Sequence, residues 1–260
     1  AFDARLSNIG TDGYIDRASV DLYSFYAQGG YFADNTSVKF ITFGGKEKTY
    51  HAWNYATKEE MKKYGRRFNS CGMYTDDDGH IRFYKDQTDN YLQMNYQLLL
   101  NHTFSAAWNL NAALHYTKGD GYYQEYKEYR LHPFMYDGKE VEKSDLIRQK
   151  KMDNHFGGGV FSVNYRNEKL DASLGGALNY YDGWHFGRVI WVKNYIGKLL
   201  PDHEYYRNKA KKTDGNLYLK ANYNLVAGLN AYADLQYRYI NYKIHGDNDK
   251  YDYNTDGLQK

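Results

Sequence analysis

The sequence predicts an all-β protein, an antiparallel transmembrane β-barrel segment of about eight strands in four hairpins, with short turns on one side and long loops on the other. Three observations predict this fold. Apolar and polar residues alternate over long stretches, the apolar rows carry no formal charge, and the connections alternate between short and long. Together these are the sequence features of outer-membrane barrels.

The alternation is clearest in the middle of the chain. From Leu92 to Phe104 every second residue is apolar or aromatic with one histidine, and the intervening residues are mostly Asn, Gln and Thr. A period of two over this length indicates a strand. The same pattern recurs in later segments. The expected strands are 15–32, 37–50, 88–104, 108–122, 154–166, 169–184, 213–226 and 229–244.

The two rows of each strand predict which face meets lipid. Aromatic residues stand mostly at the ends of the apolar rows, as in a girdle around a lipid-facing band. They are Trp108, Tyr116, Tyr180 and Tyr239. The polar rows are rich in Asn and Gln, whereas a soluble sheet would more often carry Lys and Glu. The residues expected to point into hydrocarbon are Leu110, Leu114, Leu174 and Leu219, and those expected to point inward are Asn111, Asn179 and Asn222.

The connections support the same interpretation. Short turns are expected at 34–35, 105–107, 167–168 and 227–228, and long segments at about 51–87, 123–153 and 185–212. Barrels of the outer membrane have this asymmetry. An alternative is a soluble antiparallel sandwich with decorated loops.

Composition excludes several classes. The mean hydropathy is −0.86, and no stretch approaches the roughly 20 apolar residues of a membrane helix. The 31 Tyr and only 2 Pro argue against disorder. A net charge of +2 with mixed signs predicts no nucleic-acid partner. Cys71 is the only cysteine, so no internal disulfide can form.

Motifs for catalysis are absent from the sequence. It contains no G-x-S-x-G, no H-E-x-x-H and no P-loop, so we expect no enzyme activity and no cofactor. Asp252, Asn254 and Asp256 have the alternate spacing of the start of a calcium loop, but Asp/Asn/Gly runs are also ordinary turn chemistry. They are weak calcium candidates, and no other metal site is expected.

Two aromatic tracts are candidates for ligand contact. In the first, a strand end enters an expected long loop and carries Trp184, His185, Arg188 and Trp191. In the second, the Tyr-rich tract contains Tyr122 and Tyr126. Rings and a guanidinium can stack on a ligand and bind an anionic group. The alternative is that these residues are girdle and loop packing.

Several motifs resemble the barrel of TonB-dependent outer-membrane receptors of the Bacteroidetes type. The matching stretches include 11–17, 45–50, 87–91, 115–123, 145–150, 181–187 and 234–238, and the resemblance covers nearly the whole chain. It implies one barrel domain over 1–260, located in the outer membrane of a Gram-negative bacterium. It also implies import of a scarce ligand such as a ferric siderophore, another metal chelate, haem or cobalamin. The implied partners are outer-membrane lipid, the chelate and the TonB complex, and a surface lipoprotein is a further candidate partner.

The chain departs from the whole pattern of that family. It has no plug, no TonB box and no terminal aromatic strand, and it looks like an internal piece that begins and ends in outer loops. One alternative is a complete small eight-stranded barrel acting as an anchor, adhesin or lipid-modifying enzyme. Another is a soluble carbohydrate-binding sandwich. The TonB complex would act through the plug, which this sequence lacks.

Overall fold

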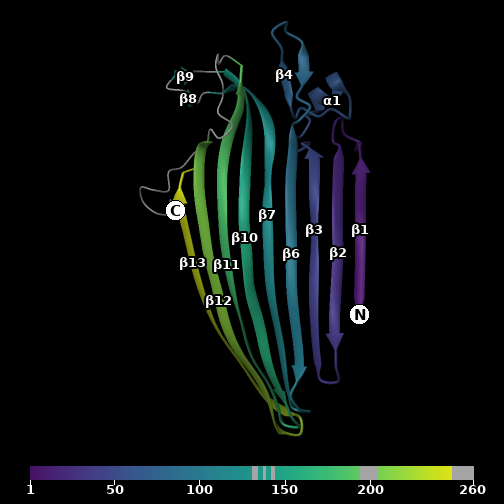
Figure 1. Cartoon of the computed structure of the whole chain (residues 1–260), viewed down its shortest axis with the longest axis vertical. Coiled ribbons are helices and arrows are strands. Elements are labelled where there is room, and N and C mark those ends of the chain that lie inside the picture. Colours follow the sequence, from purple (N-terminus) through teal and green to yellow (C-terminus); the bar gives the residue numbers. More distant parts are fainter. Residues whose placement is uncertain (131–133, 137–138, 142–143, 194–203, 248–260) are drawn as a thin grey trace.

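A computed structural model describes residues 1–130, 134–136, 139–141, 144–193 and 204–247. Figure 1 shows long strands that lie side by side in one bent sheet, with a small helix and short hairpins at one end. Within the described residues, no helix is long and apolar enough to cross a membrane.

The sheet has nine antiparallel strands in the order β1-β2-β3-β6-β7-β10-β11-β12-β13. Their bounds are β1 Phe2–Thr11, β2 Val20–Phe32, β3 Thr36–Tyr50, β6 Thr88–Thr103, β7 Trp108–Arg130, β10 Ser144–Arg166, β11 Leu170–Val192, β12 Glu204–Val226 and β13 Leu229–Gly246. Each strand pairs with the next one along the sheet, as consecutive hairpins do. The all-β, antiparallel prediction is confirmed.

The short turns lie where the sequence predicts them, and they gather at the lower end in Figure 1. They connect β2 to β3, β6 to β7, β10 to β11 and β12 to β13. In the last of these turns Gly228 has φ 81°, a backbone conformation that glycine adopts without strain. The predicted separation of short turns from long connections is confirmed.

The expected start of the sheet is wrong. Residues 2–11 form β1, paired with β2 from Phe2↔Gly29 to Thr11↔Val20. The first strand was expected at 15–32, but β2 begins at Val20. Strand β1 escaped detection because its apolar residues change rows: Phe2, Ala4 and Leu6 share one face, whereas Ile9 lies on the other.

The expected strand ends beside the long connections are also wrong. β7 continues to Arg130, β10 begins at Ser144, β11 continues to Val192 and β12 begins at Glu204. The predicted loops at 123–153 and 185–212 are therefore largely strand. Beyond the apolar band both faces carry charged and aromatic side chains, so the alternation that marked the strand disappears although its hydrogen bonds continue.

The register divides the sheet into an apolar face and a polar face. One row of the apolar face runs Leu98↔Leu114↔Gly159↔Leu178↔Gly215↔Tyr239. All four predicted lipid-facing leucines share this face, and Asn111, Asn179 and Asn222 share the polar face. A row of Tyr96, Tyr116 and Tyr180 closes the apolar band above, and a row with Trp108 and Tyr165 lies below. We call the part of the sheet between these rows the band.

Tyrosines of the polar face lie across glycines of neighbouring strands. A β-carbon added at Gly121 would meet the ring of Tyr91, one at Gly175 would meet Tyr218, and one at Gly187 would meet Tyr206. A glycine leaves its strand without a side chain to pack, and a ring laid over it covers the exposed backbone.

The upper strand ends and residues 51–87 form a second part of the molecule, which we call the cap. It contains α1 (Lys58–Tyr64) and the hairpin of β4 (Met73–Thr75) and β5 (Ile81–Phe83). Thr57 and Glu60 form a capping box at the start of α1, which satisfies two backbone N–H groups. Among the described residues, every buried side chain lies above the Tyr116 row.

Candidate functional site

The polar face above the band forms a wall of aromatic and ionisable side chains. Three of its rows run side by side across β6, β7, β10 and β11. The first contains Tyr91, Met152 and His185, the second Asp89, Tyr123 and Lys150, and the third Glu125 and Arg148. We call these residues the upper polar wall. Flat rings, cations and an imidazole are the chemical groups that recognise flat or anionic ligands.

A buried ion pair fixes the top of this wall. The Arg148 Nε donates to Glu125 Oε1 at 2.7 Å, and the two side chains are 8% and 5% exposed. Lys127 Nζ lies 2.9 Å from the other Glu125 oxygen. Burial raises the pKa of Glu125, but the hydrogen bonds and charges of Lys127 and Arg148 outweigh it and hold that pKa below its usual value. The carboxylate is therefore ionised and holds both cations in place.

His185 stands on the same wall, in the row that also contains Tyr91, Gly121 and Met152. It is half-buried, and it pairs in the register with Met152 and Asn208. Burial lowers the pKa of His185, and a hydrogen bond with Asn208 acts in the opposite direction. A neutral imidazole can accept or donate a hydrogen bond, or act as a metal ligand.

A second histidine, His51, lies where β3 ends and the cap begins. Its imidazole stacks on Trp53 with ring centroids 3.8 Å apart, and Tyr123 meets it edge-on at 6.0 Å. Its Nε2 lies 3.9 Å from the Asp89 carboxylate. Burial lowers the pKa of His51 to about 4, so the ring is neutral at neutral pH.

The predicted ligand candidates are split between the two faces. The segment 184–191, expected to enter a loop, belongs to β11. His185 lies on the polar face, whereas Trp184, Arg188, Trp191, Tyr122 and Tyr126 lie on the face that continues the apolar rows. The structure therefore does not bring the six residues together around one point.

Tyr126 lies beside Trp191 and is covered from outside by the β4–β5 hairpin. Their ring centroids are 6.0 Å apart, and Tyr74 of β4 stacks on Tyr126 at 4.3 Å. The Tyr126 hydroxyl donates to Asp145 Oδ2 at 2.9 Å, and burial together with this bond raises the pKa of Tyr126. These contacts fit packing of a hairpin against the sheet.

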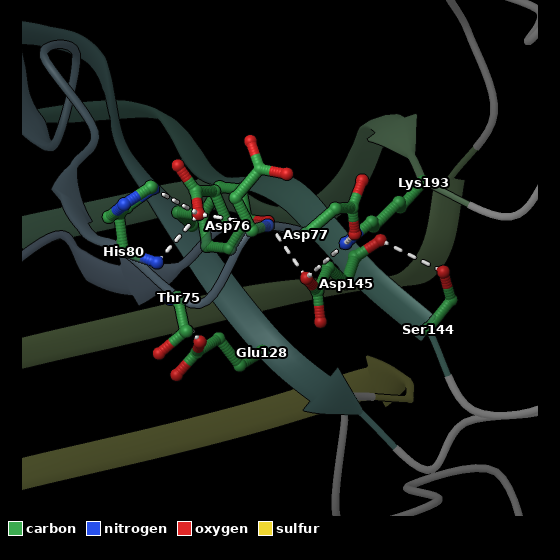
Figure 2. Close-up of polar contacts among 10 residues, drawn as sticks. Thr75, Asp76, Asp77, His80, Glu128, Ser144, Asp145 and Lys193 are labelled. Carbon is green, nitrogen blue, oxygen red and sulfur yellow. Dashed lines mark hydrogen bonds and ion pairs between the residues drawn. The ribbon is translucent and has the colours of Figure 1, made fainter.

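Polar contacts hold the same hairpin in place, as Figure 2 shows. The backbone N–H of Thr75 donates to Glu128 Oε1 at 2.7 Å. Lys193 Nζ lies 2.5 Å from Asp77 and 3.8 Å from Asp145. The contacts join β4 and the turn after it to β7, β10 and the residue that follows β11.

The turn of this hairpin contains a group of side chains that resembles a set of metal ligands. One ligand atom each from Asp76, Asp78 and His80 lie within 4.8 Å of one another. Both Asp76 oxygens are already used, since they accept from the backbone N–H of His80 at 2.7 Å and from Arg82 Nε at 2.8 Å. The group is explained by turn and ion-pair chemistry. The calcium candidates Asp252, Asn254 and Asp256 lie outside the described residues.

Sequence reasoning missed the Glu125–Arg148 pair and His51. Glu125 and Arg148 lie in stretches without apolar alternation, which were expected to be loops, and their pairing requires the register of β7 with β10. Nothing in the local sequence around a Glu and an Arg in separate tracts indicates that the two side chains are in contact. Recognition that the strands continue past the band would have placed them on one face.

No family model and no curated protein sequence matches the chain. Solved structures do match it in fold. The ferric-catecholate import receptor Fiu from E. coli, in its open form, aligns with a TM-score of 0.55 and 8% identity over 94% of this chain and 41% of that chain. FpvAI, solved in complex with pyocin S2, aligns with a TM-score of 0.62 and 12% identity over 94% of this chain and 34% of that chain.

BauA, the ferric preacinetobactin receptor from Acinetobacter baumannii, aligns with a TM-score of 0.57 and 8% identity, over 94% of this chain and 37% of that chain. The chain thus spans well under half the length of these receptors. At such low identities the likeness establishes the fold alone, a stretch of an antiparallel β-barrel wall.

Proposed function

We propose that the chain forms part of the barrel wall of an outer-membrane import receptor in a Gram-negative bacterium. Its ligand would be a ferric siderophore or a similar metal chelate, taken up with energy supplied through TonB. The observation that carries the proposal is the fold match over 94% of the chain to receptors described as importing or binding ferric chelates. The alternating faces and the aromatic rows agree with a barrel in lipid.

The upper polar wall is the surface we assign to the ligand. In a barrel the polar face lines the lumen, so Tyr91, Tyr123, Lys150 and His185 face the path of an imported molecule. Lys150 and Arg148 supply positive charge for the anionic part of a chelate, and the rings supply flat apolar contact. Trp184 and Arg188 face the other way and are not part of this contact surface.

Uptake in the native bacterium tests the function. The full-length gene is deleted, and cells are given radioactive iron bound to a catecholate, iron bound to a hydroxamate, haem, or labelled cobalamin. Uptake of one compound should be lost on deletion, and a protonophore should abolish that same uptake in wild-type cells. Unchanged uptake of every compound would contradict the proposal.

Adjacent residues on opposite faces test the site. In the full-length receptor, His185→Ala should weaken binding of the imported compound by about tenfold, the typical cost of one contact of 1–2 kcal/mol. Trp184→Ala is the matched control and should bind as wild type does. A loss confined to Trp184→Ala would instead place the ligand against the opposite face.

A further inference from the structure

The apolar face is hollowed across β7 and β10–β13. The hollow has a volume of about 750 Å³, and its lining includes Leu114, Gly159, Leu178, Gly215, Leu217 and Tyr239. It lies within the band, two residues below the Tyr116 and Tyr180 row along each strand. In a barrel this groove opens to hydrocarbon and not to the lumen.

Missing side chains create the groove. A β-carbon at Gly159 would lie 3.0 Å from Leu114 Cδ2, and one at Gly215 would lie 3.3 Å from Leu178 Cδ1. Both glycines share one row of the sheet, and Leu178 of β11 stands between them, so the floor has a bare backbone patch on each side of that leucine. The walls are leucine and tyrosine side chains. A flexible apolar chain fits such a groove because it buries surface without leaving polar groups unpaired.

Cations stand directly above the groove on the same face. Along β12 the residues of this face run Gly215, Thr213, Lys211, Lys209, Arg207. At about 3.3 Å per residue, Lys211 lies roughly 13 Å above the glycine and Arg207 roughly 26 Å above it. Lys243 of β13 pairs with Lys211 in the register, which adds a charge beside it.

Trp184 joins this cluster. Lys209 Nζ lies 4.8 Å from its ring centroid, and the Arg207 guanidinium lies 5.0 Å from it. Arg207 is also 4.2 Å from the Phe186 ring. Trp favours the boundary between an apolar band and water, and the cations beside it can bind an anion. This border of the band therefore suits an anionic headgroup.

Acidic neighbours offset only part of this charge. Asp182 lies 3.0 Å from Lys209 and 4.0 Å from Lys211, and Glu204 binds Arg188 and Arg207. Between the Tyr180 row and the Arg188 row, this face of β7 and β10–β13 carries seven cations and four carboxylates. The cations are Lys118, Lys151, Arg188, Arg207, Lys209, Lys211 and Lys243, and the carboxylates are Asp120, Asp153, Asp182 and Glu204. The face therefore has a net positive charge at the level of lipid headgroups.

We propose that this face binds one phosphate-bearing glycolipid of the outer leaflet. One acyl chain occupies the glycine-floored groove, and the phosphate lies against Lys209, Lys211 and Lys243. Charge complementarity favours this occupant. The phosphate group of the lipid pairs with the net positive charge, and an acyl chain of the same lipid fills the apolar groove beneath it. A membrane helix of another protein would fill the groove but would not offset the net positive charge above it. The proposal rests on the barrel fold and does not require the import function.

Binding of lipid A to the full-length receptor in detergent, measured by native mass spectrometry, tests the site. Wild-type receptor should hold one lipid A molecule, and dephosphorylated lipid A should bind at least tenfold more weakly. Combined K209Q, K211Q and K243Q should weaken lipid A to the same extent. G215L, which fills the groove, should weaken both forms of the lipid. K212Q is the matched control, since Lys212 neighbours Lys211 in sequence and lies on the polar face.

Folding of each variant is checked by heat-modifiable gel mobility. If the triple Gln variant does not fold, the triple Arg variant replaces it and should retain lipid A binding, while K211E alone should lose it. Equal binding of the two lipid forms, or an unchanged affinity after charge removal, would overturn the proposal. A receptor dimer in place of the lipid would also overturn it, because the groove would then be an interface between copies.

Discussion

The band and the cap are built from the same strands but are stabilised in different ways. In the band, large apolar side chains stay exposed: Leu114 is 61% exposed and Leu178 is 62% exposed. In the cap, Leu146 and Val189 are each 1% exposed, and ionisable groups such as Glu125 are buried with them. The apolar face of the band packs against lipid in place of a second layer of protein. The cap buries its own small core, as a soluble protein does.

This difference teaches where each region is vulnerable. A charge on the apolar face of the band faces hydrocarbon and has nowhere to be solvated. A lost charge in the cap leaves its partner buried in protein. Opposite substitutions should therefore destabilise the two regions: an added charge destabilises the band, and a removed charge destabilises the cap.

Glu125→Ala should give the largest effect. Removal of the carboxylate takes away the ionic partner of the buried Arg148 guanidinium, which typically costs about 3–5 kcal/mol. Urea unfolding of the full-length receptor in lipid vesicles measures the loss. The exposed Glu168 in a short turn is the control, and Glu168→Ala should change little. Equal stability of both variants would mean that the cap has no core that depends on this pair.

Leu217→Lys should come next. Leu217 lies on the apolar face in the middle of the band, and a lysine there should cost about 2–4 kcal/mol. Asn216→Lys, one residue earlier on the polar face, is at the same depth and should cost little. The same unfolding experiment compares them. Equal costs would contradict the assignment of the two faces, and a larger cost for Asn216→Lys would mean that the faces are reversed.

Acid should weaken the cap through His51. Its pKa is lowered to about 4 in the folded state, against 6.5 when unfolded, so the unfolded chain binds more protons between these values. The stability that the neutral ring contributes is present above pH 6.5 and is lost as the pH falls toward 4. Between pH 7.5 and 5.5 the loss should be about 1.4 kcal/mol.

His51→Phe provides the comparison for that titration. Phenylalanine keeps a ring against Trp53 but cannot bind a proton, so the variant should lose this part of the pH dependence. Unfolding free energies of both proteins, measured at the two pH values, give the difference directly. Identical slopes would show that His51 does not titrate on unfolding.

Asp77→Asn should have the smallest effect. Asp77 is 82% exposed, and exposed ion pairs contribute little. Loss of its contact with Lys193 should speed hydrogen exchange of the β4–β5 hairpin by at most about fivefold, without a change in the band. Exchange that also rises in β11 or β12 would mean that the hairpin supports the sheet.

Sequence alone predicted the band well and the cap poorly. In the band, alternation and charge-free rows report the face of each residue, because lipid on one side and polar groups on the other impose opposite demands. Above Tyr180 neither face is apolar, so Arg188 and Trp191 appeared to belong to a loop. Their true position on the outer face follows from strand register, which is set by pairing partners far apart in the chain. Glu125 and Arg148 became a pair only through that same register.

The tyrosine rings that lie over Gly121, Gly175 and Gly187 make the polar face shallow, with few deep recesses. Each ring lies against the backbone of the neighbouring strand, at the place where a β-carbon of the glycine would otherwise be. A molecule that moves along such a wall meets broad, shallow contacts in place of deep recesses. In the import receptor that we propose, weak contacts repeated over this wall would hold a cargo and also release it, so these glycines would influence how long the cargo stays on the wall.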